Sequence, residues 1–437
     1  MTDQPKHPVQ SIADRWARLP LPKRAALFRQ LPRGQQDDFF LALNVHDQAA
    51  LLGALPEDER RLWMRLLAPD DAADVVQHVD DVERAGLLNL LDDSTRKEVN
   101  ALLAFKEDEA GGRMDPRFAR VRADLPSDEA ISYVRRQAGH FRSIDYVYVL
   151  DPDQRLIGVV SLRELFLADT HRLVREIMHT DLIAVDEHMD QEQVARVLRK
   201  SHLLAIPVLD ENQRMAGFVT LDDIVDVIDE EASEDMQKVG GMEALDEPYL
   251  STGFYQLVKK RAGWLAVLFL GEMLTATALG HFESELDKAV VLALFLPLII
   301  SSGGNSGSQA TTLVIRAMAL GEVVMRDWLR VVRREVFAGI VLGSILGAIG
   351  LARIFAWQAM FGSYGEHYFV LALTIAYSLV GVVLFGTMAG STLPFILRRF
   401  GLDPASASAP FVATLVDVTG LIIYFTVAKL VLTGTLL

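Results

Sequence analysis

The chain has 437 residues, a formal net charge of −15 and no cysteine, so a disulfide framework and a thiolate metal site are excluded. The charge is unevenly distributed. Residues 1–250 carry 48 acidic and 30 basic side chains, whereas residues 251–437 carry 10 acidic and 13 basic ones. An acidic, soluble first part argues against a nucleic-acid partner and suits cations.

The first part begins with a predicted array of short amphipathic helices over residues 15–105. Four segments share one layout, in which a leucine and a helix-start signal precede acid-rich residues: LPRGQQDDFF, LPEDERRLW, LAPDDAADVV and LLDDSTRKEV. Their starts recur at multiples of roughly 12–13 residues, as in an array of helix pairs. The glycine-containing stretch DEAGGRMD (108–115) reads as a junction. The polar N-terminus shows no signal peptide, so we expect residues 1–250 to be cytoplasmic.

Residues 115–235 contain two near copies of one β-α pattern. IDYVYVLDPDQRLIGVVSLRELF and LLAIPVLDENQRMAGFVTLDDIVDVI each show an apolar strand, a D-x-x-x-R turn, a glycine-containing strand, a hydroxyl residue and a helix. The copies are spaced by about 60 residues. This duplication resembles a tandem pair of CBS domains, a regulatory module that often binds adenine nucleotides.

The second copy leads into a run of carboxylates without a base. The run comprises Asp222, Asp223, Asp226, Asp229, Glu230, Glu231, Glu234 and Asp235. Like charges at helical i,i+3 and i,i+4 spacing repel one another, and a solvated acidic face is the ordinary interpretation. The alternative is a site for divalent cations, because carboxylate oxygens are the ligands that such ions prefer. A cation bound here would bias a two-state gate.

The second part predicts five membrane spans, at about 262–282, 289–315, 336–361, 368–397 and 409–433, each long enough to cross about 30 Å of hydrocarbon. One set of flanks holds most of the basic residues: Lys259, Lys260, Arg261, Arg316, Arg326, Arg330, Arg333, Arg334, Arg398 and Arg399. The other set receives Lys288. This bias places the soluble part in the cytoplasm and, with an odd number of spans, the C-terminus outside.

Polar groups inside two spans indicate an ion path. The second span, FLPLIISSGGNSGSQATTLVIRA, contains glycines, Asn305 and Gln309, and we expect the glycines and proline to open its backbone beside a pore. A packing face for a neighbouring helix is the alternative. Asp417 is the only charge in FVATLVDVTGLIIYF, and an intramembrane carboxylate usually faces an ion path. The alternatives are a buried ion pair with Arg353 or a protonated acid. Glu272 is equally compatible with a pore and a packing role.

The whole order of segments resembles the MgtE family of magnesium channels. The most specific stretches are PLIISSGGNSGSQATTLVIRA, DEAGGRM and FVATLVDVTGLIIYF. The resemblance implies an all-α helical-repeat N domain (1–112), α/β CBS domains (113–176 and 177–236), a connecting helix (237–260) and a five-helix transmembrane domain (261–437). It also implies a homodimer in the plasma membrane.

The resemblance further implies roles for individual residues. Asp417, Ala413 and Asn305 match the pore. In the family, cytoplasmic acids that bind magnesium close the channel, and the matching acids here are Glu192, Asp223, Asp226, Glu231, Glu234 and Asp235. Asp70, Asp71 and Asp74 of the N domain are expected to face them. Tyr146, Arg163 and Glu164 match an ATP pocket. This chain departs from the family at His202, Leu203, Glu164 and Ala409, where the family has an acid, an aromatic residue, an aspartate and an asparagine.

The leading hypothesis is therefore a Mg²⁺-selective, Mg²⁺-gated channel for magnesium uptake. Two alternatives are a transporter of Co²⁺ or Mn²⁺ on the same scaffold and a non-conducting membrane sensor of Mg²⁺ or nucleotide. We do not expect an enzyme, because the sequence contains no phosphate loop, nucleophile motif or histidine-rich metal signature.

Overall fold

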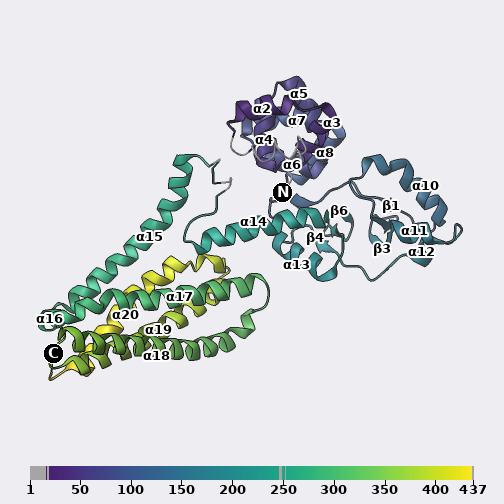
Figure 1. Ribbon diagram of the computed structural model, residues 1–437. Helices are drawn as coiled ribbons and strands as arrows, with labels where there is room; N and C mark the ends of the chain where they lie inside the picture. The colour runs from purple at the N-terminus through teal and green to yellow at the C-terminus, as the bar shows by residue number, and fades with distance from the viewer. Residues whose placement is uncertain (1–15, 17–18, 246–248, 251, 436–437) are drawn as a thin grey trace, which may run out of the picture. The chain divides into compact units, whose positions relative to one another are not determined.

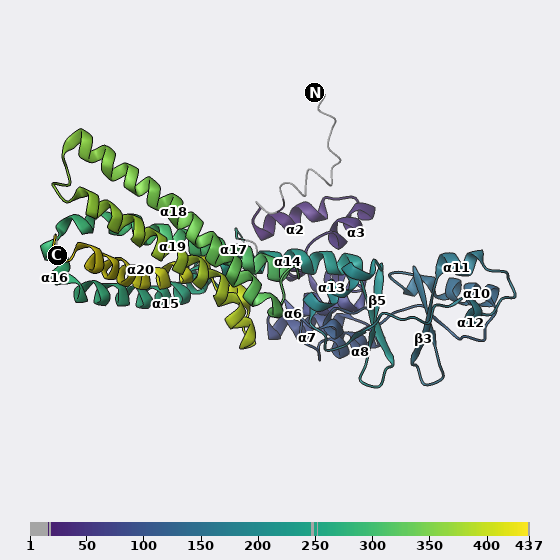
Figure 2. The ribbon, with the colours of Figure 1, turned by 90° about the horizontal axis from the view of Figure 1, so that it is seen from below.

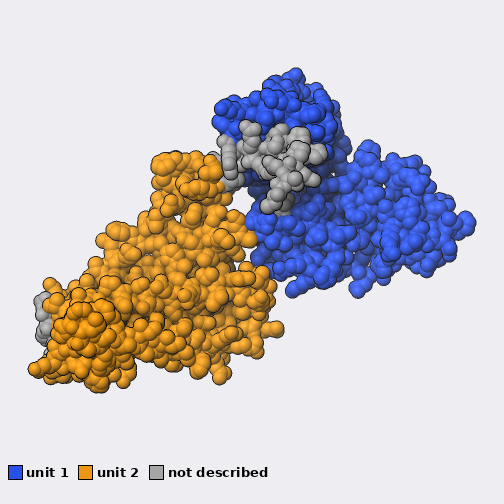
Figure 3. Space-filling model, in the orientation of Figure 1, with its two compact units in different colours: residues 1–231 blue, residues 232–437 orange. Residues whose placement is uncertain are grey.

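The computed structural model describes residue 16 and residues 19–245, 249–250 and 252–435. Its contacts divide the chain into two compact units, residues 1–231 and residues 232–437 (Figure 3). Each unit contains a hydrophobic core of its own, centred on Phe40 and Met64 in the first and on Ile375 and Phe425 in the second.

The N-terminal region of the first unit is all-helical, as predicted (Figure 1). Its helices are α2 (Leu21–Arg29), α3 (Arg33–Leu41), α4 (Val45–Ala54), α5 (Glu57–Met64), α6 (Pro69–Gln77), α7 (Asp81–Leu90) and α8 (Asp93–Leu102). Most of these helices begin directly after a Pro or Asp residue, as the start signals predicted. The Asp92 side chain, for example, accepts hydrogen bonds from the backbone N–H groups of Ser94 and Thr95 at 3.1 Å. Aromatic residues fill the centre, with the Phe28 and Trp63 rings 5.0 Å apart.

The junction forms a short helix, α9 (Ala110–Arg113), that is attached to the second CBS copy. The Ala110 N–H donates to the Met189 carbonyl at 2.8 Å, and the Gly111 N–H donates to the Glu187 carbonyl at 2.7 Å. A Cβ atom on Gly111 would lie 2.6 Å from the Phe105 ring. The glycine is therefore needed for close packing, and the junction fixes the helical array to the α/β region.

The two predicted CBS copies each form a three-stranded sheet, in the orders β1-β2-β3 and β4-β5-β6. In each sheet the first pair of strands is parallel and the second antiparallel. The first copy comprises β1 (Arg120–Val121), α10 (Ser127–Gln137), η1 (Ala138–His140), β2 (Tyr146–Leu150), β3 (Leu156–Ser161), α11 (Leu162–Leu167) and α12 (Val174–Ile177). The second comprises β4 (Val185–Asp186), α13 (Gln191–Ser201), β5 (Ala205–Leu209), β6 (Met215–Thr220) and α14 (Leu221–Val239).

The internal duplication extends to single hydrogen bonds. In the two hairpin turns, Asp151 Oδ1 accepts from the Arg155 N–H at 2.8 Å, and Asp210 Oδ1 accepts from the Arg214 N–H at 2.7 Å. The two hairpins meet at a bridge between Arg155 and Arg214 and project in the same direction (Figure 2). The equivalence confirms that the D-x-x-x-R segments are copies of one turn.

The segment predicted as a connecting helix, 237–260, is not one helix. Helix α14 continues from the second CBS copy to Val239, and the next helix, α15, begins at Phe254. Gly240 and Gly241 end α14, and Gly241 adopts a left-handed conformation with φ +74°. The paired glycines were the signal for this end.

The second unit contains five described helices that are long and apolar enough to cross a membrane, as predicted. They are α15 (Phe254–His281), α17 (Leu296–Ala319), α18 (Trp328–Phe361), α19 (Tyr368–Arg399) and α20 (Ala409–Leu432). Shorter elements join them: α16 (Glu283–Lys288), η2 (Val290–Phe295), η3 (Met325–Asp327) and η4 (Pro404–Ser406). Helix α19 packs against α17, α18 and α20, and Figure 2 shows these helices side by side.

The predicted opening of the second span at its glycines is wrong. Helix α17 is continuous through Gly303, Gly304 and Gly307, and its proline lies in the first turn, where no backbone donor is lost. A Cβ atom on Gly307 would lie 2.8 Å from Val412 and 3.0 Å from the carbonyl oxygen of Gly386. The glycines therefore let α19 and α20 approach α17 closely, which is the packing alternative.

Candidate ion path and cytoplasmic carboxylate cluster

Asp417 lies near the middle of α20 and is partly buried. Within the described residues its side chain forms no ion pair and no hydrogen bond. The alternative of an ion pair with Arg353 is wrong, because the Arg353 guanidinium lies 3.2 Å from the centre of the Trp357 ring, one turn along the same helix. The described part of the chain thus leaves a carboxylate within a membrane helix without a cationic partner.

Helices α15 and α17 pack against α20 near Asp417. Helix α15 packs against α20, where a Cβ on Gly271 would lie 2.8 Å from Thr414. The next residue, Glu272, is exposed. On the other side, Ala413 meets α17, where a Cβ on Gly304 would lie 3.5 Å from that of Ala413.

Helix α17 has two unlike faces. Gly303, Gly307 and Thr311 are buried against neighbouring helices, and Thr311 donates to the Gly390 carbonyl at 3.0 Å. Asn305 and Gln309, four residues apart on the opposite face, are exposed. The Asn305 amide donates to Ser301 at 3.4 Å within its own helix. A polar stripe on a membrane helix requires a cover other than lipid.

The middle of α17 meets the start of α20 at a position where this chain departs from the family pattern. The Ser308 hydroxyl donates to the carbonyl of Ala409 at 3.2 Å. This bond uses the backbone of Ala409, so it does not depend on the amide side chain that the family has there.

In the first unit, Arg142 brings together acids from α6 and α14. Its guanidinium lies 3.0 Å from Asp70, 3.3 Å from Asp71 and 3.3 Å from Asp223, and it is 3.6 Å from Asp222. We call these five residues the Arg142 cluster. The Asp70 side chain is buried, and its Oδ1 atom has no hydrogen-bond partner in the described structure.

A second arginine links the same two helices. Arg113 lies 3.6 Å from Asp74 and 3.1 Å from Glu230, and its side chain is 16 % exposed. Both arginines and most of the acids line one cavity of about 930 Å³ in the first unit. Asp70, Asp71 and Asp74 thus line the same cavity as Asp223 and Glu230 of α14. Their role in sensing stays a prediction.

The acids of this cavity bind protons more readily than free aspartates. Burial raises the pKa of Asp74 to about 7, although Arg113 acts in the opposite direction. Burial likewise raises the pKa of Asp115 to about 6 and raises the pKa values of Asp70, Asp71 and Asp223. Burial alone would lower the pKa of Arg142, but the Asp223, Asp71 and Asp70 carboxylates raise it, so this arginine stays charged.

The other predicted sensing acids lie elsewhere. Glu192 pairs with Arg196 on its own helix, and Glu231 accepts a hydrogen bond from the Gln191 amide at 2.7 Å. Glu234 pairs with Lys238 in the second unit. Asp235 is partly buried on α14, and the side chain of Asp226 lies outside the described residues. Among described side chains, no group of three or more histidines and acids has metal-binding geometry.

Asp223 also has a structural role. Its carboxylate accepts hydrogen bonds from the Thr220 hydroxyl and, at 3.2 Å, from the Thr220 N–H. In the first copy, Glu164 accepts from the Ser161 hydroxyl at 2.7 Å and from its N–H at 2.9 Å. Both residues complete the capping interaction at the start of a helix, which accounts for an acid at each position without any cation.

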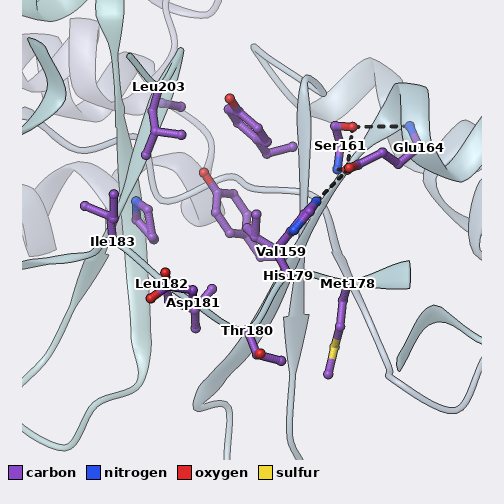
Figure 4. Close-up of a pocket in the computed structure, with 14 residues that line it drawn as sticks. Val159, Ser161, Glu164, Met178, His179, Thr180, Asp181, Leu182, Ile183 and Leu203 are labelled. Carbon is purple, nitrogen blue, oxygen red and sulfur yellow. Dashed lines mark hydrogen bonds and ion pairs between the residues drawn. The ribbon is translucent and has the colours of Figure 1, made fainter. Parts of the chain in front are cut away.

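The predicted nucleotide residues are only partly brought together. Tyr146, Glu164 and Leu203 line a cavity of about 700 Å³ between the two CBS copies (Figure 4). The Glu164 carboxylate lies 2.7 Å from His179 Nε2, within hydrogen-bond distance. Arg163 is exposed on α11 and is not among the residues that line this cavity, so its role at a nucleotide stays a prediction.

The roles of Arg142, Arg113 and His179 were missed in the sequence. Arg142 meets Asp70 and Asp223, which are 72 and 81 positions away, so no local spacing reveals the cluster. His202, at a family acid position, ends α13 in a left-handed conformation with φ 54° and is exposed. It contributes to neither cavity.

Comparisons with known proteins agree with this architecture. Residues 296–427 match the family model MgtE, described as a divalent cation transporter; residues 7–108 match the MgtE intracellular N domain, and residues 110–170 and 174–230 match CBS domains. The magnesium transporter MgtE of Thermus thermophilus is 39 % identical over 98 % of this chain and 93 % of its own length. The chain belongs to the MgtE family.

Two further MgtE proteins are similar to all or part of this chain. The magnesium transporter MgtE of Bacillus subtilis is 30 % identical over 92 % of this chain and 90 % of its own. A solved structure of the cytosolic domain of the Mg²⁺ channel MgtE in complex with ATP is 38 % identical, covering 51 % of this chain and 91 % of that chain, with a TM-score of 0.48. The chain thus contains an MgtE N domain, tandem CBS domains and, among the described residues, five helices of membrane-spanning length.

Proposed function

We propose that this MgtE family member is a homodimeric magnesium channel of the plasma membrane that takes up Mg²⁺ and closes when cytoplasmic Mg²⁺ is abundant. The observation that carries the proposal is Asp417, a carboxylate within a membrane helix that no described cation neutralises. Such a group is costly in hydrocarbon, by about 3 kcal/mol or more, unless it faces a wet path or a cation. The similarity to magnesium transporters supports Mg²⁺ as the transported ion.

The exposed polar face of α17 supports a dimer. No described helix of the same chain covers Asn305 and Gln309, and lipid cannot satisfy their amides. A second copy related by two-fold symmetry would cover this face with its own equivalent face. A pore between the copies would then be bordered by Asn305, Ala413 and Asp417 from each subunit.

The chemistry of this pore suits a hydrated ion. Mg²⁺ gives up water reluctantly, so two Asp417 carboxylates would attract the ion through its water shell. The basic flanks of the spans support an orientation with the N-terminal unit in the cytoplasm and the C-terminus outside. Mg²⁺ would move inward, driven by about 2.3 kcal/mol per charge per 100 mV of membrane potential.

The test of conduction is Mg²⁺ flux into liposomes that contain wild type or Asp417→Ala. We expect flux to fall by about 100-fold, the factor that corresponds to ~3 kcal/mol. Glu366→Gln, in a loop of the same unit, is the matched control and should conduct normally. Undiminished Mg²⁺ flux in Asp417→Ala would contradict the pore assignment. Competition by Co²⁺ or Mn²⁺ in the same assay distinguishes the alternative transporters.

We further propose that the Arg142 cluster is where cytoplasmic Mg²⁺ acts. Its carboxylates are donors suited to a hard divalent cation, and the buried, unpartnered Oδ1 atom of Asp70 offers a donor that no arginine uses. We propose the same sensing role for the acids that lie outside the cluster: Glu192, Asp226, Glu231, Glu234 and Asp235. Protease protection of residues 225–250 across a Mg²⁺ titration tests it, and equal cleavage at all concentrations would contradict it. Protection without any flux would favour the non-conducting sensor.

A nucleotide such as ATP is a second proposed ligand, favoured by the cavity between the CBS copies. Tyr146 and Tyr148 offer aromatic surfaces, and Glu164 offers a carboxylate for a ribose hydroxyl. The Glu164 carboxylate also contacts His179 and Ser161, so a ribose hydroxyl would share it with them. Isothermal titration of the full chain with ATP tests this ligand. We expect Tyr146→Ala to lose binding, and Arg163→Ala tests whether an arginine outside the cavity lining contributes as well; no heat of binding with wild type would exclude ATP.

A further inference from the structure

The end of the acidic helix is attached to the start of the predicted pore helix within the second unit. Lys238, in the last turn of α14, places its Nζ atom 2.6 Å from Oδ2 of Asp403. The other oxygen of Asp403 accepts from the Ala405 N–H at 2.8 Å and so caps η4, the turn that leads into α20. One carboxylate therefore joins Lys238 to the backbone that positions the pore helix.

Packing around this ion pair makes the attachment specific. Val239 contacts a small apolar cluster formed by Ile315 of α17 with Ala405 and Ala407. At Gly241 a Cβ atom would lie 3.0 Å from both Pro410 and the Trp264 ring. The Trp264 indole N–H donates to Ser408 at 3.1 Å, and Ser408 caps α20. Movement of the end of α14 is thus transmitted to the first turn of α20.

Lys238 has a second partner on its own helix. Its ammonium also pairs with Glu234, one turn earlier, and Glu234 is one of the proposed sensing acids. The lysine is 28 % exposed and is shared between a carboxylate on the sensing side and a carboxylate on the pore side. A divalent cation at Glu234 would compete with the ammonium for that acid and, through like-charge repulsion, favour its pairing with Asp403.

We propose that Lys238 is the positioning residue that couples the acidic helix to the pore helix. When cations withdraw Glu234 from Lys238, the ammonium is left to Asp403, and the closed arrangement of α14 and α20 gains stability. This inference rests on the proposed function, since it assumes a pore along α20 that cytoplasmic Mg²⁺ closes. It adds a single residue through which the two parts communicate.

The test measures Mg²⁺ current in excised membrane patches while Mg²⁺ is titrated on the cytoplasmic face. In Lys238→Met we expect the half-closing Mg²⁺ concentration to rise by about 2- to 5-fold, the range of a partly exposed ion pair, with unchanged current at low Mg²⁺. Asp403→Asn should give the same shift, and the double variant should add nothing further. Lys238→Arg should behave as wild type.

The matched control is Lys429→Met, which removes another lysine–carboxylate pair, 3.5 Å from Glu285, that involves the opposite end of α20. It should leave the half-closing concentration unchanged. An unchanged or lower half-closing concentration in both Lys238→Met and Asp403→Asn would overturn the coupling. Wild type that conducts no Mg²⁺, or that cytoplasmic Mg²⁺ does not close, would instead overturn the proposed function. If Lys238→Met does not fold, Asp403→Asn and Lys238→Arg decide the question.

Discussion

The Arg142 cluster and Asp417 are both carboxylate sites, but they differ in charge balance. In the cluster, carboxylates from two helices surround a guanidinium, so the protein supplies its own cation. Asp417 has no ion-pair partner among the described residues. The difference indicates two tasks: a site with a built-in cation responds when a competitor replaces it, whereas a site without one attracts an ion that passes.

The largest effect that would sharpen this comparison is expected from Arg142→Gln. Removing one partner of a largely buried ion-pair cluster leaves uncompensated carboxylates. Without Mg²⁺, the free energy of unfolding of the first unit should therefore fall by about 2–4 kcal/mol. Saturating Mg²⁺ should restore most of that loss, because the ion replaces the guanidinium. Thermal unfolding with and without Mg²⁺ measures both.

The control for Arg142→Gln is Arg122→Gln, which removes an exposed pair with Asp124 and should change little. If Arg142→Gln were equally destabilised at every Mg²⁺ concentration, Arg142 would serve stability alone and the comparison would fail.

A smaller effect follows from pH. The pKa of Asp74 is about 7 in the folded chain against an ordinary 3.8, so the native state binds the extra proton between these values. Stability of the first unit should therefore fall as pH rises from about 4 to about 7 and level off above, with Asp74 contributing about 3 kcal/mol. Asp115, with a pKa of about 6, acts in the same direction up to that pH.

Asp74→Asn should remove its share of this slope, because asparagine cannot ionise. Thermal unfolding in Mg²⁺-free buffers between pH 5 and 8 measures the slope. As pH rises, Asp74 loses its proton and fewer protons compete with Mg²⁺ for its carboxylate. The Mg²⁺ concentration needed for protease protection should therefore fall. A slope identical to that of wild type would show that Asp74 is not the titrating group.

The smallest effect concerns Glu272, an exposed acid on α15, the helix that packs against α20. If a second carboxylate concentrates cations at the path, Glu272→Gln should reduce Mg²⁺ flux by about 2- to 5-fold at low Mg²⁺ and less at saturation. Glu366→Gln again serves as control. Wild-type flux at low Mg²⁺ would assign Glu272 to packing and leave Asp417 as the single acid of the path.

Local signals were sufficient to predict the architecture. Helix starts such as Asp92, the repeated turns at Asp151 and Asp210, and the apolar lengths of the spans depend on neighbours within a few residues. The domain limits at 112, 176 and 236 stay predictions. The expected connecting helix failed because the paired glycines after Val239 stop the helix, a local signal that was overlooked.

The site was only partly predictable, because its key contacts are tertiary. Glycines in α17 were expected to open the helix, yet they serve to admit Gly386 and Val412, which no local pattern reveals. Arg142 carries no motif and acquires its role only when α6 and α14 meet around it. Arg353 was a candidate partner for Asp417, but Trp357, one turn away, takes its guanidinium.

The central claim is that Asp417 meets the ion in transit while the cytoplasmic carboxylates sense it. The most direct test is protease protection of residues 225–250 in full-length Asp417→Asn, titrated with Mg²⁺ beside wild type. The account predicts a protection midpoint equal to that of wild type in a protein that has lost Mg²⁺ flux. A midpoint that shifts by tenfold or more, or protection that disappears with Asp417, would contradict the separation of the two tasks.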